Sequence, residues 1–155
     1  MNPIDTITAD HRVVDQLYST YEALDEFSDM EKQALADAIL ESLDMHADMM
    51  EALVFPKLVD AADDAVEESR ATLAEVKIVV EELMGMMPDE PEFDSKMREL
   101  KDAFDRHSTA EEGTLLPQLS ESLSEGEQHE IGAALKDFKD AHAEVEEDGE
   151  IEENF

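Results

Sequence analysis

The segment HSTAEEGTLLPQL, from His107 to Leu119, decides the fold of this chain. A related segment, HADMMEALVFPKL, begins at His46, which lies 61 positions earlier. The same offset relates four further identical pairs: Asp44 with Asp105, Glu51 with Glu112, Pro56 with Pro117 and Leu58 with Leu119. Five identities in so short a window indicate that one helical segment, together with its chemistry, is present twice.

The two copies differ at the position that matters most for chemistry. In the downstream copy, His107 is followed four residues later by Glu111. On a helix this spacing places both side chains on one face, one turn apart, where they can bind one metal ion. In the upstream copy, the residue four positions after His46 is Met50. The sequence therefore predicts a metal-binding pair in one copy and its loss in the other.

The composition indicates a single all-α domain. The 155 residues are rich in helix-forming types and include five Gly and five Pro, and this length is enough to bury a core. The chain contains no cysteine, which excludes disulfides, thiolate zinc sites and cysteine nucleophiles. The absence of cysteine is consistent with a cytoplasmic protein.

The formal net charge of −32 excludes several classes of partner. A surface this acidic repels nucleic acid and anionic lipid, so we expect neither as a partner. The carboxylates are spread over the whole chain, which is typical of a solvated coat and of proteins that work in high salt, where screening removes most of the self-repulsion. No apolar run approaches the ~20 residues of a membrane span, and no signal-peptide pattern opens the chain. We therefore expect a cytoplasmic protein.

Hydrophobic periodicity predicts five helices, over residues 4–27, 28–56, 63–85, 91–117 and 124–143. Ser124 and Glu127 form a capping-box pattern at the start of the last helix. Four long amphipathic segments joined by short loops are typical of an up-down-up-down four-helix bundle, with the fifth, shorter C-terminal helix packed across it. We assign residues 1–143 to this domain and predict that residues 144–155 form an acidic, disordered tail.

Three histidines interrupt the apolar stripes of three different predicted helices: His11, His46 and His107. A single histidine on such a stripe is more often a core residue with a hydrogen-bond partner than a metal ligand. The combination with Glu111 is harder to explain that way. A buried carboxylate costs several kcal/mol unless it is paired or binds a metal, and no Lys or Arg lies on the inner stripes. Three imidazoles and one carboxylate suit Fe, Mn or Zn.

These motifs resemble those of hemerythrin-like (HHE cation-binding) domains over about residues 4–140. The resemblance rests on DHR at Asp10–Arg12, on HADMMEALVFP and, most specifically, on RHSTAEEGTLLP. It implies a four-helix bundle with a non-haem di-iron centre. The family's ligands are a His from the first helix, a His–Glu pair from the second, a His from the third and a second His–Glu pair from the fourth. Carried over by position, the resemblance gives the ligand set His11, His46, His107 and Glu111.

Two positions depart from the family pattern. Met50 stands where the resemblance implies the second-helix carboxylate, and Leu73 where it implies the third-helix histidine. Glu51 is a poor substitute for the carboxylate, because a step of five residues from His46 rotates it by about 140°. The family's second metal position depends on these ligands. We therefore expect a mononuclear iron site, while a site that binds nothing and a complete di-iron site remain alternatives.

Three functions are open at this stage. The first is a metal-binding module that senses or carries O2, NO or iron. The second is a redox enzyme acting on peroxide or nitric oxide, which an open coordination position would permit, although nothing in the sequence indicates a substrate site. The third is a metal-free helical interaction domain, in which Met84, Met86 and Met87 form a docking surface. Packing at a helix end is the simpler explanation for these methionines.

Overall fold

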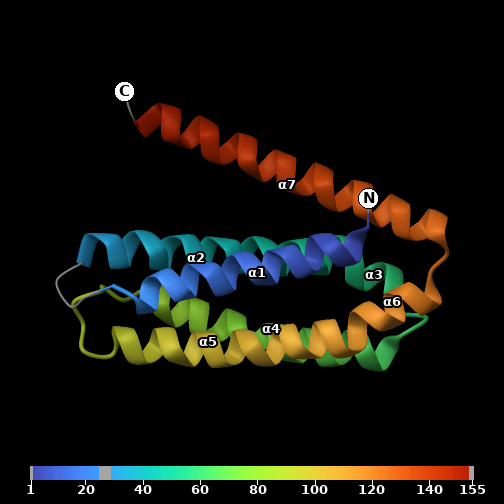
Figure 1. Cartoon of the computed structure of the whole chain (residues 1–155), viewed down its shortest axis with the longest axis horizontal. Coiled ribbons are helices and arrows are strands. Elements are labelled where there is room, and N and C mark those ends of the chain that lie inside the picture. The colour runs from blue at the N-terminus through green and yellow to red at the C-terminus, as the bar shows by residue number, and fades with distance from the viewer. Residues whose placement is uncertain (1, 25–28, 154–155) are drawn as a thin grey trace.

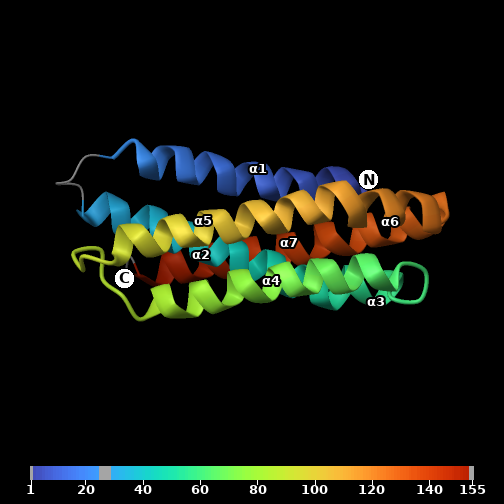
Figure 2. The ribbon, with the colours of Figure 1, turned by 90° about the horizontal axis from the view of Figure 1, so that it is seen from below.

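Four long helices lie side by side and form the body of the molecule (Figures 1 and 2). The structure, a computed structural model, describes residues 2–24 and 29–153, with side chains up to residue 143. The four helices are α1 (Pro3–Glu22), α2 (Asp29–Met49), α4 (Asp63–Met84) and α5 (Phe93–Ala110). Successive helices run in opposite directions, so the bundle has the predicted up-down-up-down order. The all-α fold class is confirmed.

Local sequence signals explain where the helices begin. The side chain of Asn2 accepts a hydrogen bond from the Ile4 backbone N–H and caps α1, with Pro3 in its first turn, where proline is tolerated. At the start of α7 (Glu125–Glu153), the backbone N–H of Ser124 donates to Glu127 Oε1, and the backbone N–H of Glu127 donates to Ser124 Oγ. This reciprocal pair is a capping box. The predicted capping box is therefore confirmed.

Two π-helical segments follow α2 and α5, and they occupy equivalent positions in the internal repeat. They are η1 (Met50–Val54) and η2 (Glu111–Leu115). Each is followed by a short α-helix with proline in its first turn, α3 (Phe55–Leu58) and α6 (Leu116–Ser122). A proline ring inside an α-helix collides with the carbonyl four residues earlier. A wider π turn relieves that collision, so the chain stays helical through the proline. The observed helix end at Leu58 is close to the predicted end near Pro56, whereas the helix predicted to end at Pro117 continues to Ser122.

The polar side chains of the interior lie between two apolar clusters along the bundle. One cluster, near α3 and α6, includes Ile7, Met50 and Leu115. The other, toward the opposite end, includes Val14 and Phe104. His11, His46 and His107 fall between the two, as do the buried Ser69 and Glu111. Since water is excluded from both sides, every polar atom in this layer must find its partner inside the protein.

Helix α7 lies outside the four-helix body and crosses one of its faces (Figure 1). Ile131 and Leu135 are buried in the first apolar cluster, and Phe138 packs against it. The helix was predicted to be short, but its backbone is helical over 29 residues, as far as Glu153. The side chains of residues 144–155 lie outside the described part, so the predicted disordered tail stays a prediction. Within the described residues, no helix is both long and apolar enough to cross a bilayer.

Candidate metal centre

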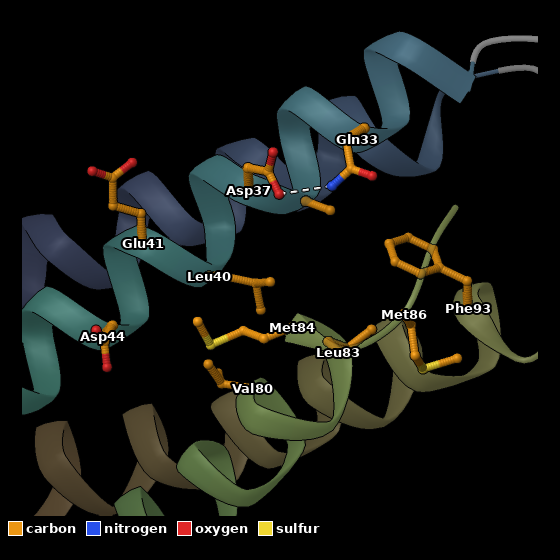
Figure 3. Close-up of a pocket in the computed structure, with 11 residues that line it drawn as sticks. Gln33, Asp37, Leu40, Glu41, Asp44, Val80, Leu83, Met84, Met86 and Phe93 are labelled. Carbon is orange, nitrogen blue, oxygen red and sulfur yellow. Dashed lines mark hydrogen bonds between the residues drawn. The ribbon is translucent and has the colours of Figure 1, made fainter. Parts of the chain in front are cut away.

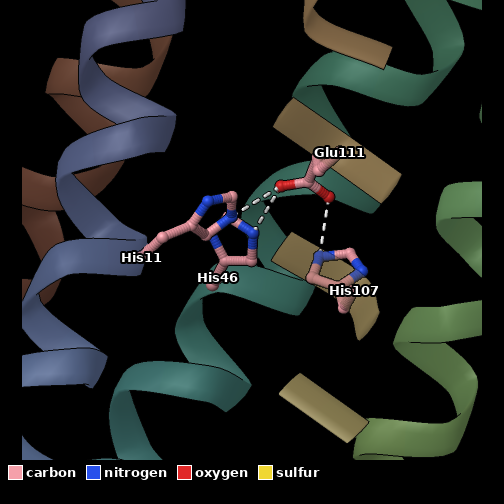
Figure 4. Close-up of side chains that lie close together, drawn as sticks. All are labelled: His11, His46, His107 and Glu111. Atoms are coloured by element: carbon pink, nitrogen blue, oxygen red, sulfur yellow. Dashed lines mark hydrogen bonds and ion pairs between the residues drawn. The ribbon is translucent and has the colours of Figure 1, made fainter. Parts of the chain in front are cut away.

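Three helices and one π segment bring the four predicted ligands together in the interior (Figure 4). His11 comes from α1, His46 from α2, His107 from α5 and Glu111 from the first position of η2. Each offers one ligand atom, and these atoms all lie within 4.8 Å of one another. All four side chains are buried. This is the arrangement that the sequence analysis predicted for these four residues.

The Glu111 carboxylate is the centre of the cluster. Its Oε1 lies 3.1 Å from His11 Nε2 and 2.9 Å from His46 Nε2. Its Oε2 accepts a hydrogen bond from Ser69 Oγ at 2.9 Å and lies 2.7 Å from His107 Nε2. The side chain is fully buried. One carboxylate thus faces three imidazole nitrogens and one hydroxyl, with no solvent around it.

The Nε2 atom of His107 is without a hydrogen bond. Although it lies 2.7 Å from Glu111 Oε2, the contact falls outside hydrogen-bond geometry, and among the described residues it is a buried side-chain nitrogen with no such partner. Buried polar atoms are rarely left in this state, because the desolvation cost is not recovered. A metal ion between the two groups would give this imidazole nitrogen a partner in place of the missing hydrogen bond. The donor set therefore fits a metal.

The opposite ring nitrogen of each histidine is held by a second partner. His11 Nδ1 lies 3.0 Å from Glu112 Oε2, and His46 Nδ1 lies 3.2 Å from Asp10 Oδ2. His107 Nδ1 lies 2.9 Å from Thr72 Oγ1. Metal-binding histidines usually have such a partner, which fixes the tautomer and directs the free nitrogen toward the ion. All three Nε2 atoms are oriented in this way toward Glu111.

His46 and Glu111 shift each other's pKa in the directions that favour their charged forms. Burial works to lower the pKa of His46, but the Glu111 charge and the hydrogen bonds to Asp10 and Glu111 outweigh it and raise that pKa to about 9. Burial works to raise the pKa of Glu111, but the His46 charge and the histidine hydrogen bonds hold it well below its usual range. Each group therefore favours the charged form of the other, the ionised carboxylate and the protonated ring.

The two residues that depart from the family pattern lie in the apolar interior. Met50 and Leu73 are both buried in the cluster near α3. Two acidic residues close in sequence to Met50 and Leu73, namely Glu51 and Glu75, do not reach the site. Glu51 pairs with Arg70 at 3.5 Å, and Glu75 pairs with Arg106 at 3.2 Å, all with exposed side chains. Within the described residues, the site therefore has one carboxylate ligand.

Sequence reasoning missed Ser69, Glu112 and Asp10. Ser69 occupies the gap in the α4 stripe between Val66 and Leu73, just as His11 occupies a gap in α1, so a polar residue at a core position was the available signal. Asp10 directly precedes His11 inside the DHR motif, but its side chain points to His46. Sequence spacing along one helix gives no indication of such a contact between helices.

Comparison with known proteins agrees with this geometry. A model of the "Hemerythrin HHE cation binding domain" family matches residues 2–119. The chain belongs to this family. The hemerythrin HHE match spans α1 through most of α6, which carry all four cluster residues. The family model does not extend over α7.

Two individual proteins are similar to this hemerythrin HHE chain. A solved structure of a hemerythrin HHE cation binding domain-containing protein from Mycobacterium kansasii superposes with a TM-score of 0.75 at 20% identity, and the match covers 91% of this chain and 89% of that one. It shows the same fold. A curated protein of Nostoc sp., named DNA nickase, is 29% identical over 148 residues. The match covers 94% of this chain and 40% of the Nostoc protein, so this chain spans well under half of that relative's length.

Proposed function

We propose that this protein binds a single non-haem metal ion, with iron as the favoured metal, through His11, His46, His107 and Glu111, and that it senses or carries O2, NO or iron. The observation that carries the proposal is the convergence of three Nε2 atoms on one buried carboxylate, one of them without a hydrogen bond. Three imidazoles and a carboxylate also suit Mn or Zn. Membership of a cation-binding family supports the proposal independently.

One metal is favoured over two because the second half of the family's site is apolar here. Met50 and Leu73 offer no ligand to a hard or borderline cation, and they are buried among other apolar side chains. Ser69 and Thr72 are the residues of α4 whose side chains form hydrogen bonds with the cluster, Ser69 with Glu111 and Thr72 with His107. A second ion would have to be held without a carboxylate of its own.

The protein's own residues determine what such a site does. When bound, iron with four protein ligands supplies open coordination positions for a small diatomic ligand. The apolar clusters on both sides exclude water from these positions. The outer partners Asp10, Glu112 and Thr72 hold the three rings in place. A redox enzyme acting on peroxide or nitric oxide would use the same ligands, and turnover of either compound by the metal-loaded protein would distinguish it from a carrier or sensor.

We propose that this chain does not bind nucleic acid, although the similar Nostoc protein is named a DNA nickase. The formal net charge of −32 opposes binding to phosphate. This chain spans 40% of that protein, so the activity in its name can reside in the remainder. The aligned part of the two chains is more simply explained as a shared hemerythrin HHE module.

The decisive experiment is the metal content of protein purified without chelator, with His11→Ala and Glu111→Ala as test variants. We expect about one metal per chain in the wild type and loss of the metal in both variants. His129→Ala is the matched control, because His129 is an exposed histidine of α7, and it should retain the metal. Circular dichroism checks that each variant is folded. Two metals per chain would contradict the mononuclear site, and none in the wild type would overturn the proposal.

A second candidate function, a metal-free interaction domain, is favoured by a groove between α2 and α4 (Figure 3). The groove has a volume of about 360 Å³ and an apolar floor that includes Leu40 and Leu83. Met84 at its edge is 72% exposed. The rim carries Asp37 and Asp44, so a basic amphipathic helix fits it better than a second acidic copy of this chain. This function requires that the groove bind such a helix and that Glu111→Ala leave that binding unchanged.

A further inference from the structure

A side chain of α7 reaches the outer partners of the candidate metal centre from outside the four-helix body. Lys139 donates a hydrogen bond to Asp10 Oδ1. The other carboxylate oxygen, Asp10 Oδ2, lies 3.2 Å from His46 Nδ1. His46 in turn contacts Glu111 through Nε2, at 2.9 Å. A continuous path of polar contacts thus joins α7 to the centre of the ligand cluster.

The position of Lys139 depends on the packing of α7. Ile131 and Leu135, two and one turns earlier, are buried in the cluster near α3, and Phe138 packs against the same cluster. These contacts hold α7 against α1 and η1. Lys139 can therefore contact Asp10 only while α7 is packed on the bundle.

Asp10 depends on that contact in turn. Its side chain is only 8% exposed, so the carboxylate has little access to water. The described partners of its two oxygens are Lys139 and His46. Without the lysine, one oxygen of a buried charge is left without a partner, which is costly, and the carboxylate gains by turning toward solvent. That rotation would release the His46 ring.

We propose that Lys139 is a positioning residue of the metal site, and that metal binding through His46 and packing of α7 on the bundle strengthen each other. This inference rests on the proposed metal-binding function. Packed α7 holds Asp10, which holds the His46 ring in the orientation that a metal needs. Coupling between two such events is reciprocal. If packing of α7 raises the metal affinity by a given factor, bound metal raises the equilibrium constant for packing of α7 by the same factor.

Lys136 provides a matched control on the same helix. It lies one turn before Lys139, carries the same charge, and pairs with Asp140 of α7 at 2.8 Å, with both side chains exposed. Substituting methionine for either lysine removes one positive charge from α7 and keeps a long unbranched side chain. The two variants differ in the loss of the contact to Asp10.

The experiment measures Co2+ affinity and the visible spectrum of bound Co2+ for the wild type and for Lys139→Met, Lys139→Arg and Lys136→Met. Loss of an outer partner of a metal-binding histidine weakens binding by about 10–100-fold, and Lys139 acts one contact further out, so we expect about a tenfold rise in Kd for Lys139→Met. The Co2+ bands should shift in that variant. Lys139→Arg restores a cation opposite Asp10 and should recover most of the affinity, while Lys136→Met should match the wild type.

Hydrogen exchange of α7 amides, measured with enough Co2+ to saturate every variant, provides a second readout that differences in Kd do not distort. Added Co2+ should raise the protection of residues 131–139 in the wild type and in Lys136→Met, but much less in Lys139→Met. Equal Co2+ affinity and equal protection in the two methionine variants would overturn the inference while leaving the metal site intact. If the wild type binds no Co2+, both the inference and the proposed function fail.

Discussion

The two copies of the internal repeat have the same backbone and opposite chemistry. In each, an α-helix changes to a π turn, passes a proline and continues as a short α-helix. In each, the first residue of the π turn is fully buried. In η2 that residue is Glu111, which three histidines surround, and in η1 it is Met50, which lies among apolar side chains.

In η1 and η2, different residues determine the helix geometry and the chemistry of the site. The π turn is present in both copies, so it does not depend on the carboxylate, and the proline that both copies share is its common cause. The chemistry depends on one side chain per copy. The next residue in each copy shows the same division, because Glu112 holds His11 whereas Glu51 pairs with Arg70 near the surface.

The largest expected effect comes from making the upstream copy chemically like the downstream one. Met50→Glu places a carboxylate at a fully buried position among apolar side chains. We expect the metal-free variant to lose roughly 3 kcal/mol of unfolding free energy, since a second carboxylate buried among apolar side chains costs several kcal/mol. Urea unfolding measures this loss. Glu51→Gln is the adjacent control, and it should cost less than about 1 kcal/mol because its ion pair is exposed.

Combining Met50→Glu with Leu73→His tests whether these two positions alone limit the site to one ion. The double variant restores both ligand types that the family resemblance implies at these positions. We expect it to bind two Co2+ per chain, where the wild type binds one, and to regain with metal part of the stability that Met50→Glu lost. One Co2+ per chain in the double variant would show that Met50 and Leu73 are not what limits the wild-type site to a single ion.

An intermediate effect is expected at Ser69, the residue of α4 that contacts the downstream copy. Its hydroxyl donates to Glu111 Oε2 at 2.9 Å in the buried interior. Hydrogen bonds to charged groups contribute about 1.5–3 kcal/mol, so Ser69→Ala should lower the unfolding free energy of the metal-free protein by about 2 kcal/mol. Bound metal takes over part of the carboxylate's charge, so the loss should be smaller in the metal-loaded protein. Ser108→Ala, at a local surface contact, should cost much less.

The residues that sequence reasoning identified are polar residues at positions where the helical pattern calls for apolar ones. His11, His46 and His107 interrupt apolar stripes, and the spacing of His107 and Glu111 is meaningful on any helix. The four-helix order followed from stripe lengths and short loops. These features are properties of single helices, so periodicity alone reveals them.

The features that sequence reasoning missed depend on contacts between helices, or on whether packing or a proline decides where one helix ends. Asp10 contacts His46 of the next helix and Lys139 of α7, and no local pattern encodes that. The π turns arise because buried residues on both sides of the proline keep the chain helical, whereas proline by itself predicts a helix end. Packing outweighed the local signal at Pro56 and Pro117.

The smallest expected effect concerns Asp94, a carboxylate outside the site, and the dependence of its stabilising hydrogen bond on pH. Asp94 is half-exposed and accepts a hydrogen bond from the Tyr21 hydroxyl at 2.6 Å. That hydrogen bond, followed by contacts with Lys32, lowers the pKa of Asp94. Because the folded pKa lies below the unfolded one, the stabilisation is complete above the unfolded pKa of about 3.9 and is lost as pH falls through the folded value.

Tyr21→Phe should therefore cost about 1 kcal/mol at pH 7 and less near pH 3, as measured by urea unfolding in high salt at both pH values. Tyr18→Phe is the matched control, because the Tyr18 hydroxyl donates to the backbone carbonyl of Met97 at 3.0 Å and that carbonyl does not titrate. Its cost should be the same at both pH values. An equal cost for Tyr21→Phe at pH 7 and pH 3 would show that the hydrogen bond does not depend on the charge of Asp94. Glu111 would then be the better example of a carboxylate that the fold keeps ionised, because burial works to raise its pKa and the surrounding histidines hold that pKa well below its usual range.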